Sequence, residues 1–166
     1  HPAQNNKLKK KIKLLLVDDH PVVRRGIASC LARHDHLQIV GEASNGQEAV
    51  TAFERESYAA IVMDCQMPTM DGYEATRLIR AQEERPDASR TRAHIPIIAL
   101  TANALPGDRE RCKAAGMAVP CFCSRVGLGA EIPHLLGRRI GQRPRRILGK
   151  SRIGRQAGRA EQDQPA

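Results

Sequence analysis

Acidic residues and a threonine stand at the ends of apolar runs in this sequence. Asp18 and Asp19 follow the first run, Asp64 ends a later one, and Thr101 follows the last. Carboxylate oxygens suit magnesium better than zinc, because magnesium takes oxygen ligands and keeps several waters. Taken alone, an acid pair at a strand end is more often a solvated turn or a helix cap, and a threonine before a helix is often only a cap. A site exists here only if the fold brings these residues together.

Short apolar runs alternate with segments that are apolar on one face. Strands are predicted at Leu14–Val17, Leu37–Ala43, Ala59–Asp64 and Ile95–Leu100. Helices are predicted to carry Val23, Ile27 and Leu31, then Ala49, Val50 and Phe53, then Ala75, Leu78 and Ile79, with a last helix over Leu105–Ala115. This alternation predicts an α/β fold with a parallel sheet between two layers of helices, in which ligands bind at the carboxyl ends of the strands. Asp19, Asp64 and Thr101 all fall at such ends.

The net charge of +9 is concentrated near the end of the sequence. Residues 1–119 hold 17 of the 27 basic and 15 of the 18 acidic residues. No apolar run approaches the roughly 20 residues that span a bilayer, so we expect no membrane contact. The five cysteines are odd in number, which favours reduced thiols and a cytoplasmic location, although a parent protein could be membrane-anchored. We expect His1–Asn6 to continue from a longer protein.

Three segments together resemble the receiver domains of two-component systems: Leu15–His20, Val62–Gly72 and Ile97–Ala104. The resemblance covers about Lys13–Met117 and implies a flavodoxin-like, doubly wound parallel sheet of five strands. We assign residues 1–12 to a basic lead and 13–119 to the receiver domain. The run from Met63 to Thr76 looks most like receivers of hybrid sensor histidine kinases, whereas the start from Val17 to Gly26 looks more like free-standing transcriptional regulators.

The resemblance also implies a role for each site residue. Asp64 would accept a phosphoryl group from phosphohistidine, supplied by a histidine kinase or a histidine phosphotransfer domain. Asp19 would bind Mg²⁺ directly and Asp18 mainly through water. Asp64 and the backbone carbonyl of Gln66 would complete the magnesium ligands. Thr101 would hydrogen-bond the phosphoryl group once it is bound. This movement would pull the following loop inward and reshape the adjacent face of the domain.

The sequence departs from the family pattern after Met117. Receivers usually end their fifth strand with lysine and proline, but here no lysine occurs between Lys113 and Lys150, and Cys123 takes the lysine position in an ungapped comparison. Arg125 could serve only after a two-residue insertion, and its planar fork replaces an ammonium group poorly. An amphipathic fifth helix is hard to find. We therefore assign 120–166 to an atypical basic tail that is either disordered or read out of frame, which the nucleotide sequence would decide.

Two other functions stay open at this point. The first is a fragment of a DNA-binding response regulator, which the basic tail favours but no helix-turn-helix pattern supports. The second is a pseudo-receiver, an interaction module that has lost efficient switching with its lysine. Phosphorylation of the chain would argue against the second. Whether the chain is itself an enzyme, with self-phosphorylation and autodephosphorylation, stays open as well.

We predict that the basic tail binds nucleic acid only weakly and without sequence preference. Arg138, Arg139 and the arginines of 143–146 supply charge, but beyond Phe122 the tail has neither a reading helix nor aromatic residues for stacking. Titrating labelled duplexes of unrelated sequence at increasing salt should give equal affinities that fall steeply. A selective complex that survives high salt would instead support the DNA-binding regulator.

Overall fold

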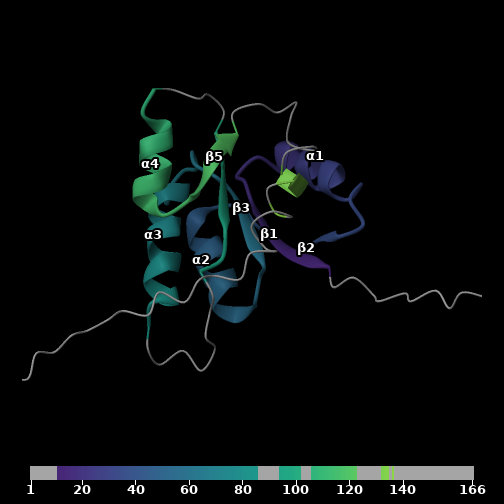
Figure 1. Ribbon diagram of the computed structural model, residues 1–166, viewed down its shortest axis with the longest axis horizontal. Helices are drawn as coiled ribbons and strands as arrows, with labels where there is room; N and C mark the ends of the chain where they lie inside the picture. The colour runs from purple at the N-terminus through teal and green to yellow at the C-terminus, as the bar shows by residue number, and fades with distance from the viewer. Residues whose placement is uncertain (1–10, 86–93, 102–105, 123–131, 135, 137–166) are drawn as a thin grey trace, which may run out of the picture.

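The computed structural model describes residues 11–85, 94–101, 106–122, 132–134 and 136, and they form a parallel sheet with helices on both faces (Figure 1). The sheet has five strands in the order β2-β1-β3-β4-β5, and every pair is parallel. The strands are β1 (Ile12–Val17), β2 (Leu37–Ala43), β3 (Ala60–Asp64), β4 (Ile97–Leu100) and β5 (Ala118–Phe122). This order is that of the flavodoxin-like folds, so the predicted fold class is confirmed.

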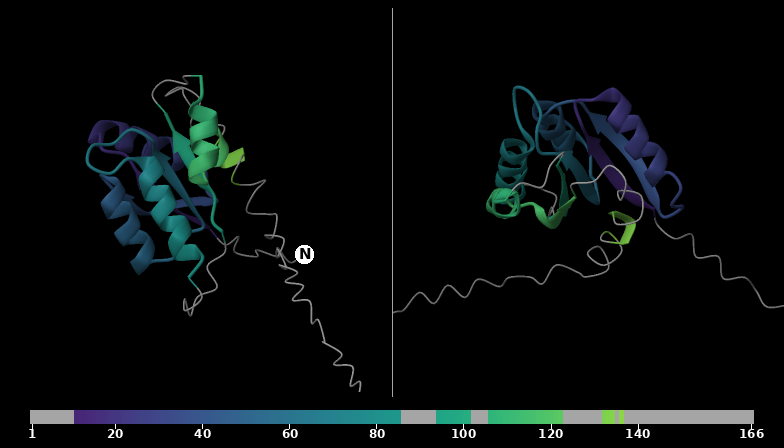
Figure 2. Two further views of the ribbon diagram at one scale, coloured as in Figure 1. Left: turned by 90° about the vertical axis from the view of Figure 1, so that its left-hand side faces the viewer. Right: turned by 90° about the horizontal axis from the view of Figure 1, so that it is seen from above.

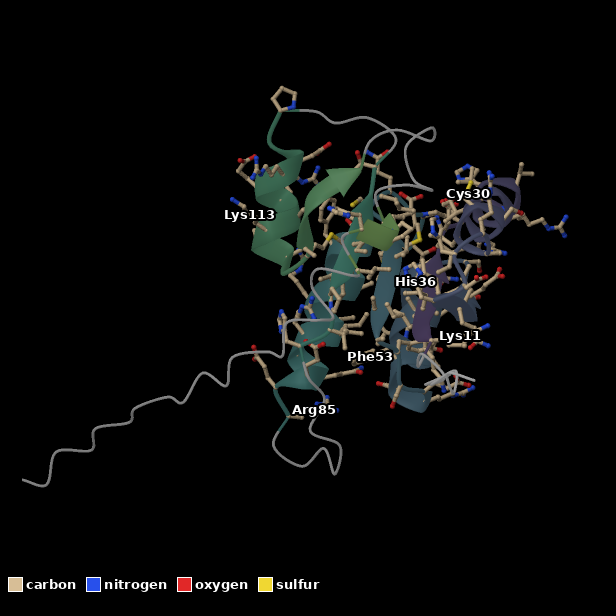
Figure 3. All side chains as sticks on the ribbon, turned by 45° about the vertical axis from the view of Figure 1, so that its right-hand side comes forward. Lys11, Cys30, His36, Phe53, Arg85 and Lys113 are labelled. Carbon is tan, nitrogen blue, oxygen red and sulfur yellow. The ribbon has the colours of Figure 1, made fainter. Side chains whose placement is uncertain are left out.

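The helices form two layers, one on each face of the sheet. They are α1 (Pro21–Leu31), α2 (Gly46–Arg55), α3 (Gly72–Glu83) and α4 (Asp108–Ala115). Helices α2, α3 and α4 cover one face and α1 the other (Figures 1 and 2). Figure 3 shows Lys113 of α4 and Cys30 of α1 on opposite sides of the sheet. None of the helices described has the length and apolarity needed to cross a bilayer.

Alternation along the strands builds the two cores. Leu15 and Val17 of β1 face α2 and α3, whereas Leu14 and Leu16 face α1, and all four are fully buried. Successive side chains of a strand point to opposite faces, so a continuous apolar run supplies both layers at once. This is why Leu14–Val17 shows no polar alternation.

Local sequence signals set the starts of two helices. The Asn45 side chain accepts a hydrogen bond from the Glu48 N–H at 2.9 Å, and Glu48 Oε2 in turn accepts one from the Ser44 N–H at 2.8 Å. The Asp71 side chain caps α3 by accepting from the Glu74 N–H at 2.7 Å. Side-chain caps of this kind satisfy N–H groups at the start of a helix that have no partner within the helix.

The end of the chain differs from the sequence-based prediction. The last predicted helix was to begin at Leu105, which lies outside the described residues, but Pro106 and Gly107 form a turn and α4 begins only at Asp108. Gly107 has φ +94°, a left-handed conformation that excludes it from a right-handed helix, so the helix starts at the next residue. Leu78, predicted on the buried face of α3, is 40% exposed.

The fold also continues past residue 119. The fifth strand, which the sequence left uncertain, pairs with β4, and Leu100 lies opposite Phe122. Residues 132–134 and 136 are helical, and Ile132 and Leu136 are fully buried in the core that α1 covers. We did not predict a helix there. Residues beyond the predicted boundary at 119 therefore contribute to the hydrophobic core.

We expect Gly72→Ala to destabilise the fold by more than about 2 kcal/mol, since backbone would have to move. A Cβ at Gly72 would overlap the carbonyl oxygen of Asp64 and approach Cys65 Cα to 3.0 Å. Gly26→Ala is the matched control, because a Cβ there meets nothing within 4 Å, so it should be neutral or slightly stabilising. Chemical denaturation measures both, and equal midpoints for the two variants would contradict the close packing at Gly72.

Candidate functional site

The predicted acids meet where β1 and β3 end. Val17 lies opposite Met63 in the parallel pairing of these strands, so the residues that follow emerge side by side. The ligand atoms of Asp18, Asp19, Asp64 and His20 all lie within 4.8 Å of one another. This edge is the switch point of the fold, where the chain turns from one layer to the other and ligands bind.

His20 is the member of this cluster that we did not predict as a site residue. Its Nδ1 lies 2.9 Å from Asp19 Oδ1 and 3.8 Å from Asp18 Oδ1. The available signal was its position directly after the acid pair, but sequence alone does not tell whether an imidazole turns toward the acids or toward solvent.

Backbone N–H groups hold two of the carboxylates. His20 N donates to Asp18 Oδ1 at 2.8 Å, and Gln66 N donates to Asp64 Oδ1 at 2.9 Å. Each bond runs from the second residue after the acid, so the loop itself orients the side chain. Such bonds favour the ionised carboxylate.

Arg24 positions the loop between β1 and α1. Its Nη1 donates to the backbone carbonyl of Asp18 at 2.6 Å, and its Nε donates to Glu42 Oε2 at 2.9 Å. Glu42 belongs to β2, so Arg24 ties the acidic loop to the neighbouring strand. We did not single out this residue from the sequence.

Burial and mutual repulsion oppose the ionisation of the acids. Burial, as the main cause, and the charges of Asp18 and Asp19 together raise the pKa of Asp64 to about 6, although the hydrogen bond from Gln66 opposes them. Burial likewise raises the pKa of Asp18, which is 3% exposed, although the His20 N–H bond lowers it. A positive ion among these groups would relieve both effects.

One carboxylate oxygen of the cluster, Asp19 Oδ1, is buried without a hydrogen-bond donor among the described residues. His20 Nδ1 lies 2.9 Å away but donates no hydrogen bond to it. A buried carboxylate oxygen without a donor is costly unless a cation or water meets it. The atoms of the cluster that could bind a metal ion are mainly carboxylate oxygens, which fits magnesium.

Thr101 lies at the same edge of the sheet. Leu100 is opposite Asp64 in the pairing of β3 with β4, and the Cys65 N–H donates to the Leu100 carbonyl at 2.9 Å. Thr101 follows directly and is buried. The predicted role of the Gln66 carbonyl stays a prediction. Cys123 and Arg125, the two positions considered for the family lysine, lie outside the described residues.

The loop after Asp64 is tightly folded. Thr69 has φ +72°, and the Met70 N–H donates to the Pro68 carbonyl at 2.9 Å. The Gly72 N–H donates to the Cys65 carbonyl at 3.2 Å, which brings the start of α3 back against the end of β3. Asp64, which precedes this turn, is partly exposed, so a reactant can reach it.

Comparison with known proteins agrees with this geometry. The family model described as the response regulator receiver domain matches residues 14–119. A hybrid signal transduction histidine kinase of Dictyostelium discoideum is 42% identical over 109 residues, which cover 63% of this chain and 5% of that protein. The chain thus spans only a small part of the length of the curated relatives it matches.

Solved structures show the same fold. The receiver domain of a sensor histidine kinase from Pseudomonas aeruginosa, with a magnesium ion coordinated in its active-site cleft, is 42% identical with a TM-score of 0.62, covering 80% of this chain and 99% of that one. The receiver domain of a Saccharomyces cerevisiae response regulator, co-crystallised with a histidine phosphotransfer protein, is 27% identical with a TM-score of 0.59, covering 81% and 89%. The sequence match runs from β1 into β5, and with the shared fold it shows that this chain belongs to the response regulator receiver domains, the phosphoacceptor units of two-component phosphorelays.

Proposed function

We propose that Asp64 is the phosphoacceptor of this receiver domain and that Asp18 and Asp19 hold Mg²⁺ beside it. The observation that carries the proposal is the meeting of three carboxylates at the ends of β1 and β3, where none of the residues that the structure describes donates a hydrogen bond to the buried Asp19 Oδ1. Asp64 is the only one of the three that lies on β3, where the loop leaves it partly exposed. We assign it the reaction for that reason.

The reaction is a transfer between nitrogen and oxygen. A carboxylate oxygen of Asp64 attacks the phosphorus of a phosphohistidine, the new O–P bond forms as the N–P bond breaks, and the histidine nitrogen leaves with the electron pair. The product is an acyl phosphate on Asp64. A bound Mg²⁺ supplies charge neutralisation, which three carboxylates facing a phosphoryl group require.

The remaining residues orient rather than react. The Gln66 N–H holds Asp64 Oδ1 at 2.9 Å, and Arg24 holds the Asp18 carbonyl at 2.6 Å. We propose the carbonyl of Gln66 as a further magnesium ligand and the Thr101 hydroxyl as a donor to the phosphoryl group. Without the family lysine, we expect phosphorylation to be retained but its signal to be transmitted poorly, since a switch needs contacts that differ between its two states.

A histidine kinase or a histidine phosphotransfer domain is the proposed phosphoryl donor. Support comes from the yeast receiver that was co-crystallised with a histidine phosphotransfer protein.

We predict that Asp64→Asn abolishes phosphorylation by acetyl phosphate and magnesium, because the amide is no longer a nucleophile. Mass spectrometry of the intact protein and of its peptides measures both the extent and the site. Asp71→Asn is the matched control, since asparagine caps a helix as well as aspartate does and Asp71 lies outside the cluster. It should be labelled like the wild type.

Two outcomes would overturn this assignment. Labelling of Asp64→Asn at the wild-type level would place the phosphoryl group elsewhere. A wild-type protein that takes no phosphoryl group under conditions where another receiver is labelled would support the pseudo-receiver instead.

We predict that Mg²⁺ raises the thermal unfolding midpoint of the wild type, and more so at about pH 8 than at about pH 5. The pKa of Asp64 is raised to about 6, so below it a proton occupies the carboxyl and competes with the cation. Asp19→Ala should lose the magnesium-dependent shift, and Asp18→Ala should lose less of it, because its contact is expected to run through water.

Asp35→Ala serves as the control, since Asp35 is an exposed acid outside the cluster. Its magnesium-dependent shift should match that of the wild type. Equal shifts in all four proteins, or a larger shift at the lower pH, would rule out cation binding at this cluster.

A further inference from the structure

We infer that His20 is a nitrogen ligand at the acidic cluster, so that the site also takes divalent transition-metal ions that favour imidazole. The inference rests on the proposed function in one respect, the presence of a cation site formed by Asp18, Asp19 and Asp64. It adds a ligand whose chemistry differs from that of the acids. What carries it is the placement of the His20 ring among their oxygens.

One distance suits shared coordination by His20 and Asp19. In an octahedral site with bonds of about 2.1 Å, adjacent ligands lie about 3.0 Å apart and opposite ligands about 4.2 Å. The 2.9 Å from His20 Nδ1 to Asp19 Oδ1 matches adjacent ligands, whereas the 3.8 Å to Asp18 Oδ1 matches neither value, in keeping with an Asp18 contact that runs through water. The Asp19 oxygen nearest the ring is buried and has no hydrogen-bond donor among the described residues.

Hydrogen bonds hold the main chain of His20 next to the acids. The His20 N–H donates to Asp18 Oδ1 at 2.8 Å, and the His20 carbonyl accepts from the Arg24 N–H at 2.9 Å. His20 is the residue that precedes α1, yet its side chain makes no capping hydrogen bond to the helix. Its ring lies beside the acids instead.

The chemical consequence is a wider choice of metal. Magnesium takes oxygen ligands, whereas imidazole favours ions such as Co²⁺, Ni²⁺ and Zn²⁺, which bind nitrogen more strongly. One imidazole added to three carboxylates makes a mixed nitrogen and oxygen site. The His20 side chain is 68% exposed, so an ion can reach it from solvent.

The test compares Co²⁺ with Mg²⁺ on the whole chain. Co²⁺ bound to an imidazole shifts the ring protons far outside the normal proton NMR range, which reports the ligand directly. His20→Gln should remove that signal and weaken Co²⁺ binding by roughly tenfold or more, while Mg²⁺ binding changes much less. Mg²⁺ in excess should displace the Co²⁺ from the wild type, because both ions use one site.

His36→Gln is the matched control, since His36 lies outside the cluster, with its ring centroid 5.8 Å from that of His34. It should leave the Co²⁺ affinity at the cluster and its competition with Mg²⁺ unchanged. If His20→Gln binds Co²⁺ as tightly as the wild type and keeps the shifted signals, His20 is no ligand and the inference is wrong, while the carboxylate site stands. If Asp19→Ala binds both ions like the wild type, the proposed cation site itself fails.

Discussion

The parallel pairing of β1 with β3 is the constraint on which the site depends. Val17 and Met63 lie opposite each other with both side chains fully buried, and the chain then leaves the sheet through acidic residues on both strands. A shift of the register by one residue would turn the buried side chains to the wrong core, so the pairing is strongly specified. The carboxylates come together because the apolar strands pack in this one way, and not through any attraction among themselves.

The fold therefore holds the carboxylates together despite the repulsion between their charges and the cost of burying them. Burial and the neighbouring charges raise the pKa of Asp64 to about 6, so ionisation at neutral pH costs the apo fold on the order of a few kcal/mol. Backbone N–H bonds to Asp18 and Asp64 offset part of that cost. Packing on both faces of the sheet supplies the remaining stabilising free energy. The site accordingly lies at the end of fully buried strands. The same repulsion creates the demand for a cation.

Close packing and hydrogen bonds connect the site to the helices. The start of α3 lies against the end of β3 at Gly72, where no side chain fits, and the Asp71 cap begins the helix at that point. On the other side, Arg24 joins the Asp18 carbonyl to Glu42 of β2. Packing and hydrogen bonds thus tie the acidic residues to α1, α3 and β2.

The sequence by itself determined the first four strands, the first three helices and the chemical type of the acids. Apolar runs that end in Asp18 and Asp64 specify buried strands, because only a strand buried on both faces reads as a continuous apolar run, and carboxylate oxygen is the ligand type that a hard cation prefers. Tertiary structure alone decided that His20 and Arg24 join the acids. The His20 ring turns toward Asp18 and Asp19, its neighbours in the sequence, and Arg24 reaches Glu42 on β2, and no local pattern encodes either contact. Tertiary structure also decided that Ile132 and Leu136 belong to the core, because the buried residues that share it lie far away in the sequence, on α1 and on β1 to β4. Secondary-structure propensity and hydrophobic period can be recognised within one segment, whereas the burial of a residue depends on the other segments that pack against it.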